Sequence, residues 1–238
     1  MKEKYSSEGI SVLDTMASAG KFNAWMYETV RPHMRKSIIE FGSGSGTFSK
    51  MIAKDFPKSR IVLSDFDDMF VRKLHKEFGG MPNISSRKID LENKKDFFEL
   101  EDSFDTAIAL NVMEHVLDDQ KAIGNIYASL QKGGRFIMLV PAYRSLYGEV
   151  DKSIGHHRRY SKSDIRQKAL KAGFSIKKMH YFNAPGIVGW IVNGKIMKKK
   201  TIDPGAMAAY EKLIGVVKKI DPLFAKVAGL SIITVLEK

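Results

Sequence analysis

The feature that most constrains this fold is a glycine-rich turn that directly follows a short apolar run. Residues 38–47 read Ile-Ile-Glu-Phe-Gly-Ser-Gly-Ser-Gly-Thr. Glycines at alternate positions let the backbone turn sharply and let a ligand lie directly against main-chain N–H groups. A buried strand that enters a helix through such a turn is typical of open α/β sheets, which bind ligands at the carboxyl ends of their strands.

The rest of the chain supports this class of fold, because β-rich runs alternate with helical patterns. The alternation favours a doubly wound, Rossmann-like parallel sheet with helices on both faces. Strands are predicted at residues 37–41, 60–64, 84–89, 104–110, 135–140, 174–182 and 230–236. Helices are predicted at residues 47–56, 68–78, 94–100, 119–131 and 163–172. We expect Gly133-Gly134 and Gly173 to end the helices that precede them.

Two regions depart from the alternation. Residues 1–36 are predicted to be helical, with one apolar face formed by Phe22, Trp25, Met26 and Val30. Residues 183–228 separate the last two strands by far more than a hairpin loop. Apolar residues in this insert repeat at a helical period: Met207, Tyr210, Leu213, Ile214, Val217 and Ile220. We expect one domain, 1–238, divided into a helical cap (1–36), a core (37–182), a helical insert or lid (183–228) and a last strand (229–238).

The composition excludes several chemistries. The chain has 238 residues and no cysteine, so it has no disulfide framework, no Cys-ligated metal and no thiolate nucleophile. Its 39 Lys and Arg against 27 Asp and Glu give a net charge of +12. That surplus favours nucleic acid, anionic lipid or a phosphorylated substrate as partner, and it is equally compatible with a solvated basic surface.

The apolar stretches of the chain predict its location. The first ten residues are polar and lack the apolar region of a signal peptide. The apolar-leaning stretch 182–194 is too short to span a bilayer. We therefore expect a cytoplasmic protein. In the insert, Trp190, Ile191 and Ile196 beside Lys195 and the lysines at 198–200 predict an apolar and basic surface that contacts a membrane peripherally. The alternative for this segment is an amphipathic helix packed on the core.

Spacing distinguishes the cofactors that use glycine turns. No Gly-Lys pair follows the turn, as a phosphate-binding loop requires, and Thr47 stands where a dinucleotide fingerprint has its third glycine. Asp65 ends the second strand, 21 residues past Gly44, where a carboxylate can accept hydrogen bonds from ribose hydroxyls. Asp90 ends the third strand, where an adenine amino group can donate. For each aspartate the alternative is a helix N-cap or turn role.

The Glu-x-Gly-x-Gly-x-Gly turn resembles that of class I S-adenosylmethionine-dependent methyltransferases. Residues 104–116 (Phe-Asp-Thr-Ala-Ile-Ala-Leu-Asn-Val-Met-Glu-His-Val) resemble the fourth-strand motif of the small-molecule branch, and residues 130–136 (Leu-Gln-Lys-Gly-Gly-Arg-Phe) its turn into the fifth strand. Residues 22–25, 155–160 and 181–183 resemble a bacterial subgroup described as type 11 or type 12.

This resemblance implies a seven-stranded sheet with an antiparallel last strand and S-adenosyl-L-methionine as methyl donor, leaving S-adenosyl-L-homocysteine as product. It also implies the donor-binding residues, which are Glu40, Gly42, Ser43, Gly44, Gly46, Asp65, Asp90, Leu91, Asn111 and Met113. The implied acceptor is a small molecule, or one that is lipid-linked or sugar-like.

His115 is the candidate general base, because it follows the fourth strand closely and faces the methyl group in relatives that methylate hydroxyls. Its alternative role is to shape the pocket or to bind the donor. Candidate acceptor-binding residues are Trp25, His156, His157, Arg158, Arg159, Tyr160, Tyr181 and Asn183. In the alternative interpretation the arginines form structural ion pairs with Glu149, Asp151 or Asp164. We expect no metal site, because the neighbours His156 and His157 rarely converge on one ion.

Other functions remain as alternatives. The residues Asn111-Val112-Met113-Glu114 differ from the motif of adenine-amino methyltransferases, and the absence of cysteine excludes the covalent pyrimidine route. Methylation of RNA or of protein, and a non-catalytic donor-binding protein of the same fold, are the competing hypotheses. Neither the acceptor atom nor the oligomeric state follows from the sequence.

Overall fold

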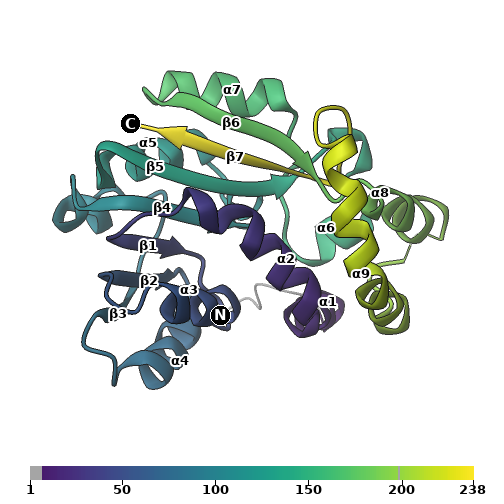
Figure 1. Cartoon of the computed structure of the whole chain (residues 1–238), viewed down its shortest axis with the longest axis horizontal. Coiled ribbons are helices and arrows are strands. Elements are labelled where there is room, and N and C mark those ends of the chain that lie inside the picture. The colour runs from purple at the N-terminus through teal and green to yellow at the C-terminus, as the bar shows by residue number, and fades with distance from the viewer. Residues whose placement is uncertain (1–6, 198) are drawn as a thin grey trace.

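A computed structural model describes residues 7–197 and 199–238 and contains one seven-stranded sheet (Figure 1). The strand order is β3-β2-β1-β4-β5-β7-β6, and β7 runs antiparallel to both of its neighbours. The strands are β1 (Ile38–Phe41), β2 (Ile61–Asp65), β3 (Ile84–Lys88), β4 (Phe104–Leu110), β5 (Leu130–Pro141), β6 (Ser175–Phe182) and β7 (Ser231–Glu237). The predicted Rossmann-like sheet with an antiparallel last strand is thereby confirmed.

The central strands form because both of their faces are buried. Every residue of β1 and β2 is buried, as expected for parallel strands covered by helices on two sides. Successive side chains of a strand point to opposite faces, and the neighbours Ile38 and Ile39 accordingly belong to two different apolar clusters. A central parallel sheet of this kind brings the carboxyl ends of its strands to one edge.

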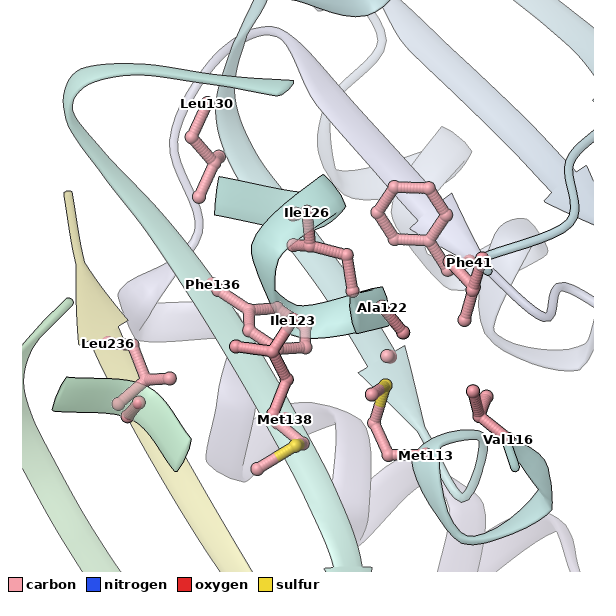
Figure 2. Packing of buried hydrophobic residues seen from close by; sticks show 14 of the residues in the cluster. Phe41, Met113, Val116, Ala122, Ile123, Ile126, Leu130, Phe136, Met138 and Leu236 are labelled. Atoms are coloured by element: carbon pink, nitrogen blue, oxygen red, sulfur yellow. The ribbon is translucent and has the colours of Figure 1, made fainter. Parts of the chain in front are cut away.

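Helices on one face are α5 (Asp119–Ser129) and α7 (Lys162–Lys171), and Figure 2 shows α5 residues Ala122, Ile123 and Ile126 near Phe136 and Met138 of β5. The other face is covered by α2 (Gly20–Val30), α3 (Thr47–Asp55), α4 (Asp68–Phe78) and α9 (Pro204–Phe224). The remaining helical segments are α1 (Ser7–Ser18), α6 (Glu149–Ser153), α8 (Gly186–Trp190), the π-helix η5 (Ile191–Ile196) and the 3-10 turns η1 (Arg31–His33), η2 (Lys94–Leu100), η3 (Met113–His115) and η4 (Arg144–Leu146).

The N-terminal segment is helical as predicted, and its expected apolar face is buried. Phe22, Trp25, Met26 and Val30 are all buried in α2, and α2 packs against α9 of the insert. The main-chain N–H of Phe22 donates to Glu211 of α9 over 2.7 Å. Segments from opposite ends of the chain therefore form one wall beside the sheet, and Figure 1 shows α1, α6, α8 and α9 gathered at the end towards which β5 points.

Two details differ from the sequence-based expectation. Helix α5 already ends at Ser129, and β5 begins at Leu130, so Gly133 and Gly134 lie inside the strand and do not end the helix. The sheet register shifts opposite them, between Phe104 and Thr106 of β4. Gly173, by contrast, directly follows the end of α7 with φ of 98°, as predicted.

The second difference lies in α9. Its periodicity predicts the helix correctly. Of the four apolar residues from Leu213 to Ile220 that define this period, Ile214 and Val217 are buried, whereas Leu213 and Ile220 are exposed.

In the described part of the chain, no helix combines the length and the apolar character that crossing a membrane requires. Residues 1–6 of the predicted cap and Lys198 of the predicted basic surface lie outside the described residues.

Candidate active site

The glycine turn after β1 has the conformation that its sequence predicts. Gly42, Gly44 and Gly46 have φ of 67°, 52° and 84°, in the left-handed region that favours glycine. A Cβ on Gly42 would lie 2.5 Å from a methyl of Val112, so a larger residue does not fit. The N–H of Gly44 donates to Asp65 Oδ2 over 2.9 Å, which joins the turn to the end of β2.

A cleft of about 500 Å³ lies along this turn and across the ends of β1, β2, β3 and β4. Six of the ten predicted donor residues line it: Gly42, Gly44, Asp65, Asp90, Leu91 and Asn111. Phe66 and Phe70, which the sequence reasoning did not select, also line it, as do Leu13, Asp14 and Ala17 of α1. Exposed Phe66 on the loop after β2 gives the cleft an aromatic surface.

The two predicted carboxylates reach the cleft from adjacent strands. Asp65 Oδ1 accepts a hydrogen bond from the N–H of Asp67, and Asp90 Oδ1 accepts one from the N–H of Glu92, each over 2.9 Å. These local bonds fix the orientation of both side chains. Because an ionised carboxylate offers about four acceptor positions, each can still accept a bond from a ligand. The residues therefore fit a nucleoside whose sugar hydroxyls and base amino group donate hydrogen bonds.

Four predicted donor residues are absent from the lining that the described residues form: Glu40, Ser43, Gly46 and Met113. Glu40 lies buried below the turn, where one carboxylate oxygen accepts hydrogen bonds from Ser43 (3.0 Å) and Ser49 (2.5 Å). Burial raises the pKa of Glu40 to about 7, against the effect of these two bonds. Gly46 precedes α3, and Met113 is fully buried in the core.

A second cavity of about 220 Å³ adjoins the first. Leu13, Ala17, Asn111 and His115 line both spaces. The second cavity is mostly apolar, with contributions from Met16, Phe22, Met26, Ile154, Trp190 and Ile202. Its polar side chains include Asn23, His115, His156, Arg159 and Asn183. An apolar cavity with a few convergent polar groups is typical of a small-molecule site.

The structure separates the predicted acceptor residues into groups. His156, Arg159 and Asn183 line the second cavity, whereas His157, Arg158 and Tyr160 line a separate groove, to which Arg159 also contributes. Trp25 is buried in the core, where its ring centroid lies 4.2 Å from that of Phe182. Tyr181 stacks on Tyr143 with centroids 5.4 Å apart.

Both arginines form ion pairs, as the alternative interpretation proposed, and Arg159 does so with one of the expected partners, whereas Arg158 pairs with Asp119. Arg158 Nη1 lies 3.0 Å from Asp119, whose other oxygen lies 2.6 Å from Lys168 Nζ. The hydroxyl of Tyr160 also donates to Asp119, over 2.8 Å. Burial and the nearby Asp119 charge raise the pKa of Tyr160, so its hydroxyl stays protonated.

Buried Arg159 pairs with the predicted Asp151, with Nε 2.9 Å from Oδ1. His156 Nδ1 lies 2.8 Å from the same oxygen. Although burial alone would raise the pKa of Asp151, the hydrogen bond with His156 and the Arg159 charge outweigh it and lower the pKa. The guanidinium of Arg159 also lies 4.1 Å from the ring centre of Trp190 in the insert. Side chains from two segments, residues 151–159 and the insert, therefore position one another at this cavity.

Sequence reasoning missed several lining residues. Leu13, Met16 and Ala17 carry no motif, and only the packing of α1 brings them to the cleft. Asn23 lies two residues before Trp25, inside a segment that carries the family resemblance, but the sequence analysis selected Trp25 and not Asn23.

Among the lining residues that were predicted, Asn111 and Asn183 have backbone φ angles of 54° and 64°. Such backbone conformations often occur at functional sites, and they become visible only in the structure.

Comparisons with known proteins agree with this geometry. Residues 39–136 match a family model described as a methyltransferase domain. Malonyl-[acyl-carrier protein] O-methyltransferase 1 of Ilyobacter polytropus is 28% identical over 178 residues, which cover 71% of this chain and 65% of that protein. The chain spans between about half and two thirds of the length of three curated relatives that it matches, and 5% of the length of a fourth.

Solved structures show the same fold. An S-adenosylmethionine-dependent methyltransferase from Mesorhizobium loti is similar with a TM-score of 0.63 at 15% identity, covering 92% of this chain and 100% of that chain. Phosphoethanolamine N-methyltransferase 2 of Haemonchus contortus, in complex with S-adenosyl-L-methionine, is similar with a TM-score of 0.61 at 16% identity. This similarity covers 91% of this chain and 52% of that chain. Residues 39–136 therefore match a methyltransferase domain, and the fold of the chain is that of S-adenosylmethionine-dependent methyltransferases.

Proposed function

We propose that this protein transfers the methyl group of S-adenosyl-L-methionine to a small acceptor held in the second cavity. The observation that carries the proposal is the contact between the two spaces, which share Asn111 and His115 as lining residues. A donor in the first cleft and an acceptor in the second would then meet at a single wall. Holding two reactants in line can lower the barrier by ~7–11 kcal/mol.

In this proposal each part of the donor has named partners. The main chain at Gly42 and Gly44 lies against the donor, Asp65 accepts from its ribose hydroxyls, and Asp90 accepts from its adenine amino group. Glu40 and Ser43 support the turn from below and do not contact the donor. The bound donor supplies an electrophilic methyl group, and the protein orients it towards the second cavity.

His115 lies where the methyl group would pass to the acceptor. We propose that it accepts a proton from an acceptor that must lose one, which adds ~10²–10⁴-fold to the rate. Asn23, Asn183 and Arg159 would orient the acceptor within the cavity.

The size of the second cavity supports a small acceptor or the reactive end of a longer one. Its volume of about 220 Å³ is below the ~300–1,000 Å³ of sites that enclose a drug-sized ligand. The apolar wall suits a lipid-linked acceptor, and the polar group at Arg159 suits a sugar or an anion. One relative is by its name an O-methyltransferase of malonyl-[acyl-carrier protein]. A small group on a large carrier fits the second possibility, the reactive end of a longer acceptor.

Two measurements test this function. Isothermal titration with S-adenosyl-L-methionine and with S-adenosyl-L-homocysteine should show binding of both. Incubation with methyl-labelled donor and a metabolite and lipid extract should then label a small molecule. Labelling of RNA or of protein in parallel samples would favour those alternatives, and donor binding without any labelled product would favour a non-catalytic role.

A specific observation also favours contact with a membrane surface in the cytoplasm. Large apolar side chains on α9 and just beyond it are exposed at a helical period: Leu213, Val216, Ile220, Leu223, Phe224 and Val227. Lys212, Lys219 and Lys226 are exposed beside this stripe, seven residues apart. Exposed apolar residues of α8 and η5, among them Val188 and Ile196, extend the apolar surface. An apolar stripe flanked by lysines is typical of helices that lie on anionic lipid.

Vesicle flotation tests this contact. The protein should float with vesicles that contain an anionic lipid and remain below with neutral ones. The double variant Val216→Glu, Leu223→Glu should lose flotation. The control Leu170→Glu, which places the same charge at an exposed apolar residue on α7, should not. Equal flotation of both variants, or none for the unmodified protein, would contradict membrane contact.

A further inference from the structure

Three side chains of metal-binding type converge beside the acceptor cavity. Glu114 and His115 lie on η3 after β4, and His156 follows α6. One ligand atom from each lies within 4.8 Å of the other two. His115 and His156 also line the acceptor cavity. The fold thus assembles two imidazoles and a carboxylate from segments that are distant in the sequence.

Glu114 is the member that most needs a partner. It is fully buried, and neither carboxylate oxygen accepts a hydrogen bond from the described part of the chain. Its Oε1 lies 3.6 Å from Nε2 of His156. Leaving a buried carboxylate without hydrogen bonds is costly, and such a group in a folded protein calls for an explanation such as a bound ion. Burial raises the pKa of Glu114 to about 7, which reflects the same cost.

His156 is already oriented as a metal ligand would be. Its Nδ1 lies 2.8 Å from Asp151 Oδ1, so that the N–H on this side can donate to the carboxylate. Asp151 is fixed in turn by Arg159 and by the N–H of Gly148, 2.9 Å from Oδ2. Nε2 then presents its lone pair on the side of Glu114. Histidines that bind metals commonly donate their other N–H to a carboxylate in this way.

The buried charged groups also fit a cation. Two buried carboxylates, Asp151 and Glu114, lie in this region with the buried guanidinium of Arg159, whose Nε lies 2.9 Å from Asp151. We propose that Glu114, His115 and His156 bind a divalent transition-metal ion of the Zn²⁺ class, with Asp151 as the positioning residue of His156. Two imidazoles and a carboxylate form a donor set that Zn²⁺ accepts.

The remaining coordination position would open into the acceptor cavity, where a water or an acceptor oxygen can occupy it. In the metal-bound protein His115 is a ligand, and the bound cation takes over the task of favouring the deprotonated acceptor. The sequence-based expectation of no metal considered only the neighbours His156 and His157. The structure places His156 with Glu114 instead, and His157 is exposed.

The test uses the full-length protein after treatment with a chelator and needs no methyl acceptor. Zn²⁺ is titrated calorimetrically, and Co²⁺ is added to record its visible absorption. We expect one Zn²⁺ per chain and a Co²⁺ spectrum that Zn²⁺ abolishes. The variants Glu114→Gln and His156→Asn should bind neither Zn²⁺ nor Co²⁺. The variant Asp151→Asn should bind Zn²⁺ about 10- to 100-fold more weakly. His157→Ala is the matched control and should bind as the unmodified protein does.

The outcomes separate this site from the proposed methyl transfer. Absence of Zn²⁺ and Co²⁺ binding by the unmodified protein, or undiminished binding by Glu114→Gln, would overturn the metal site even if methyl transfer were active. Loss of binding in His157→Ala equal to that in His156→Asn would also overturn it. Circular dichroism shows whether each variant folds. If Glu114→Gln does not fold, His156→Asn and the Co²⁺ spectrum decide.

Discussion

The first cleft, which we propose as the donor cleft, and the second, which we propose as the acceptor cavity, share lining residues but are built in different ways. The donor cleft follows consecutive strand ends, and its glycines and carboxylates lie in short motifs between residues 42 and 111. The acceptor cavity draws on α1, α2, η3, the segment after α6 and the insert, from Val12 to Ser231. The difference shows that the donor half depends mainly on local motifs, to which packing adds only α1, whereas the acceptor half depends on long-range packing.

The largest expected effect is at His115, which belongs to both halves. Replacing His115 with alanine should lower kcat by ~10²–10⁴-fold, because the group that removes a proton from the acceptor, or that holds the cation with this task, is lost. The affinity for S-adenosyl-L-homocysteine, measured by calorimetry, should change little. His75→Ala, at an exposed position on α4, is the control and should keep full turnover. Equal loss of donor affinity and turnover would assign His115 to the donor half alone.

The next effect concerns Glu40 below the donor turn. Its pKa of about 7 in the folded protein exceeds the ordinary value of 4.5 because of burial, so the folded state binds the proton more tightly. Its stabilising contribution is complete below about pH 4.5 and is lost as the pH rises through about 7, a change of about 3 kcal/mol.

Urea unfolding at pH 5 and pH 8 measures this change. Glu40→Gln should remove this part of the pH dependence. Glu99→Gln, whose side chain is 82% exposed, should retain it. An unchanged pH profile in Glu40→Gln would show that Glu40 does not hold a raised pKa.

Gly42 tests the donor half by sterics. An alanine there adopts a left-handed backbone and places its Cβ 2.5 Å from Val112. We expect the donor affinity to fall by about 10- to 100-fold, which corresponds to ~1–3 kcal/mol. In the control Gly124→Ala, no described atom lies within 4 Å of the new Cβ, and the helix should gain ~0.5–1 kcal/mol with donor affinity unchanged. Unaltered donor binding in Gly42→Ala would place the donor elsewhere.

Trp190 tests the acceptor half and gives the smallest expected effect. It lies over Arg159, and its indole N–H donates to the carbonyl of Leu146 over 3.1 Å. Trp190→Ala should raise the acceptor KM by about tenfold, or ~1.4 kcal/mol, with donor affinity retained. Phe98→Ala, at an exposed residue of η2, should alter neither. A change in donor affinity as large as that in KM would show that the two halves are not independent.

Most of the sheet and the donor half could be predicted from the sequence. Strand positions follow from apolar runs, and each parallel strand ends at the same edge, so that motifs after successive strands meet without further information. The glycine turn, Asp65 and Asp90 were found in this way. Glu40 and Met113 show what the motifs do not predict. The structure places both outside the lining of the cleft, and a motif residue below a turn or in the core looks the same in a sequence as one that lines a cleft.

The sequence by itself therefore determined the class of fold, the glycine turn and the positions of the strands along the chain, since these depend on local periodicity and backbone preference. Only the tertiary structure decided that α1 and the insert enclose a second cavity, that α9 keeps an apolar face exposed, and that Glu114 meets His156. These features depend on contacts between segments far apart in the chain. Their energies come from burial and from charge neutralisation, which no spacing along the sequence encodes.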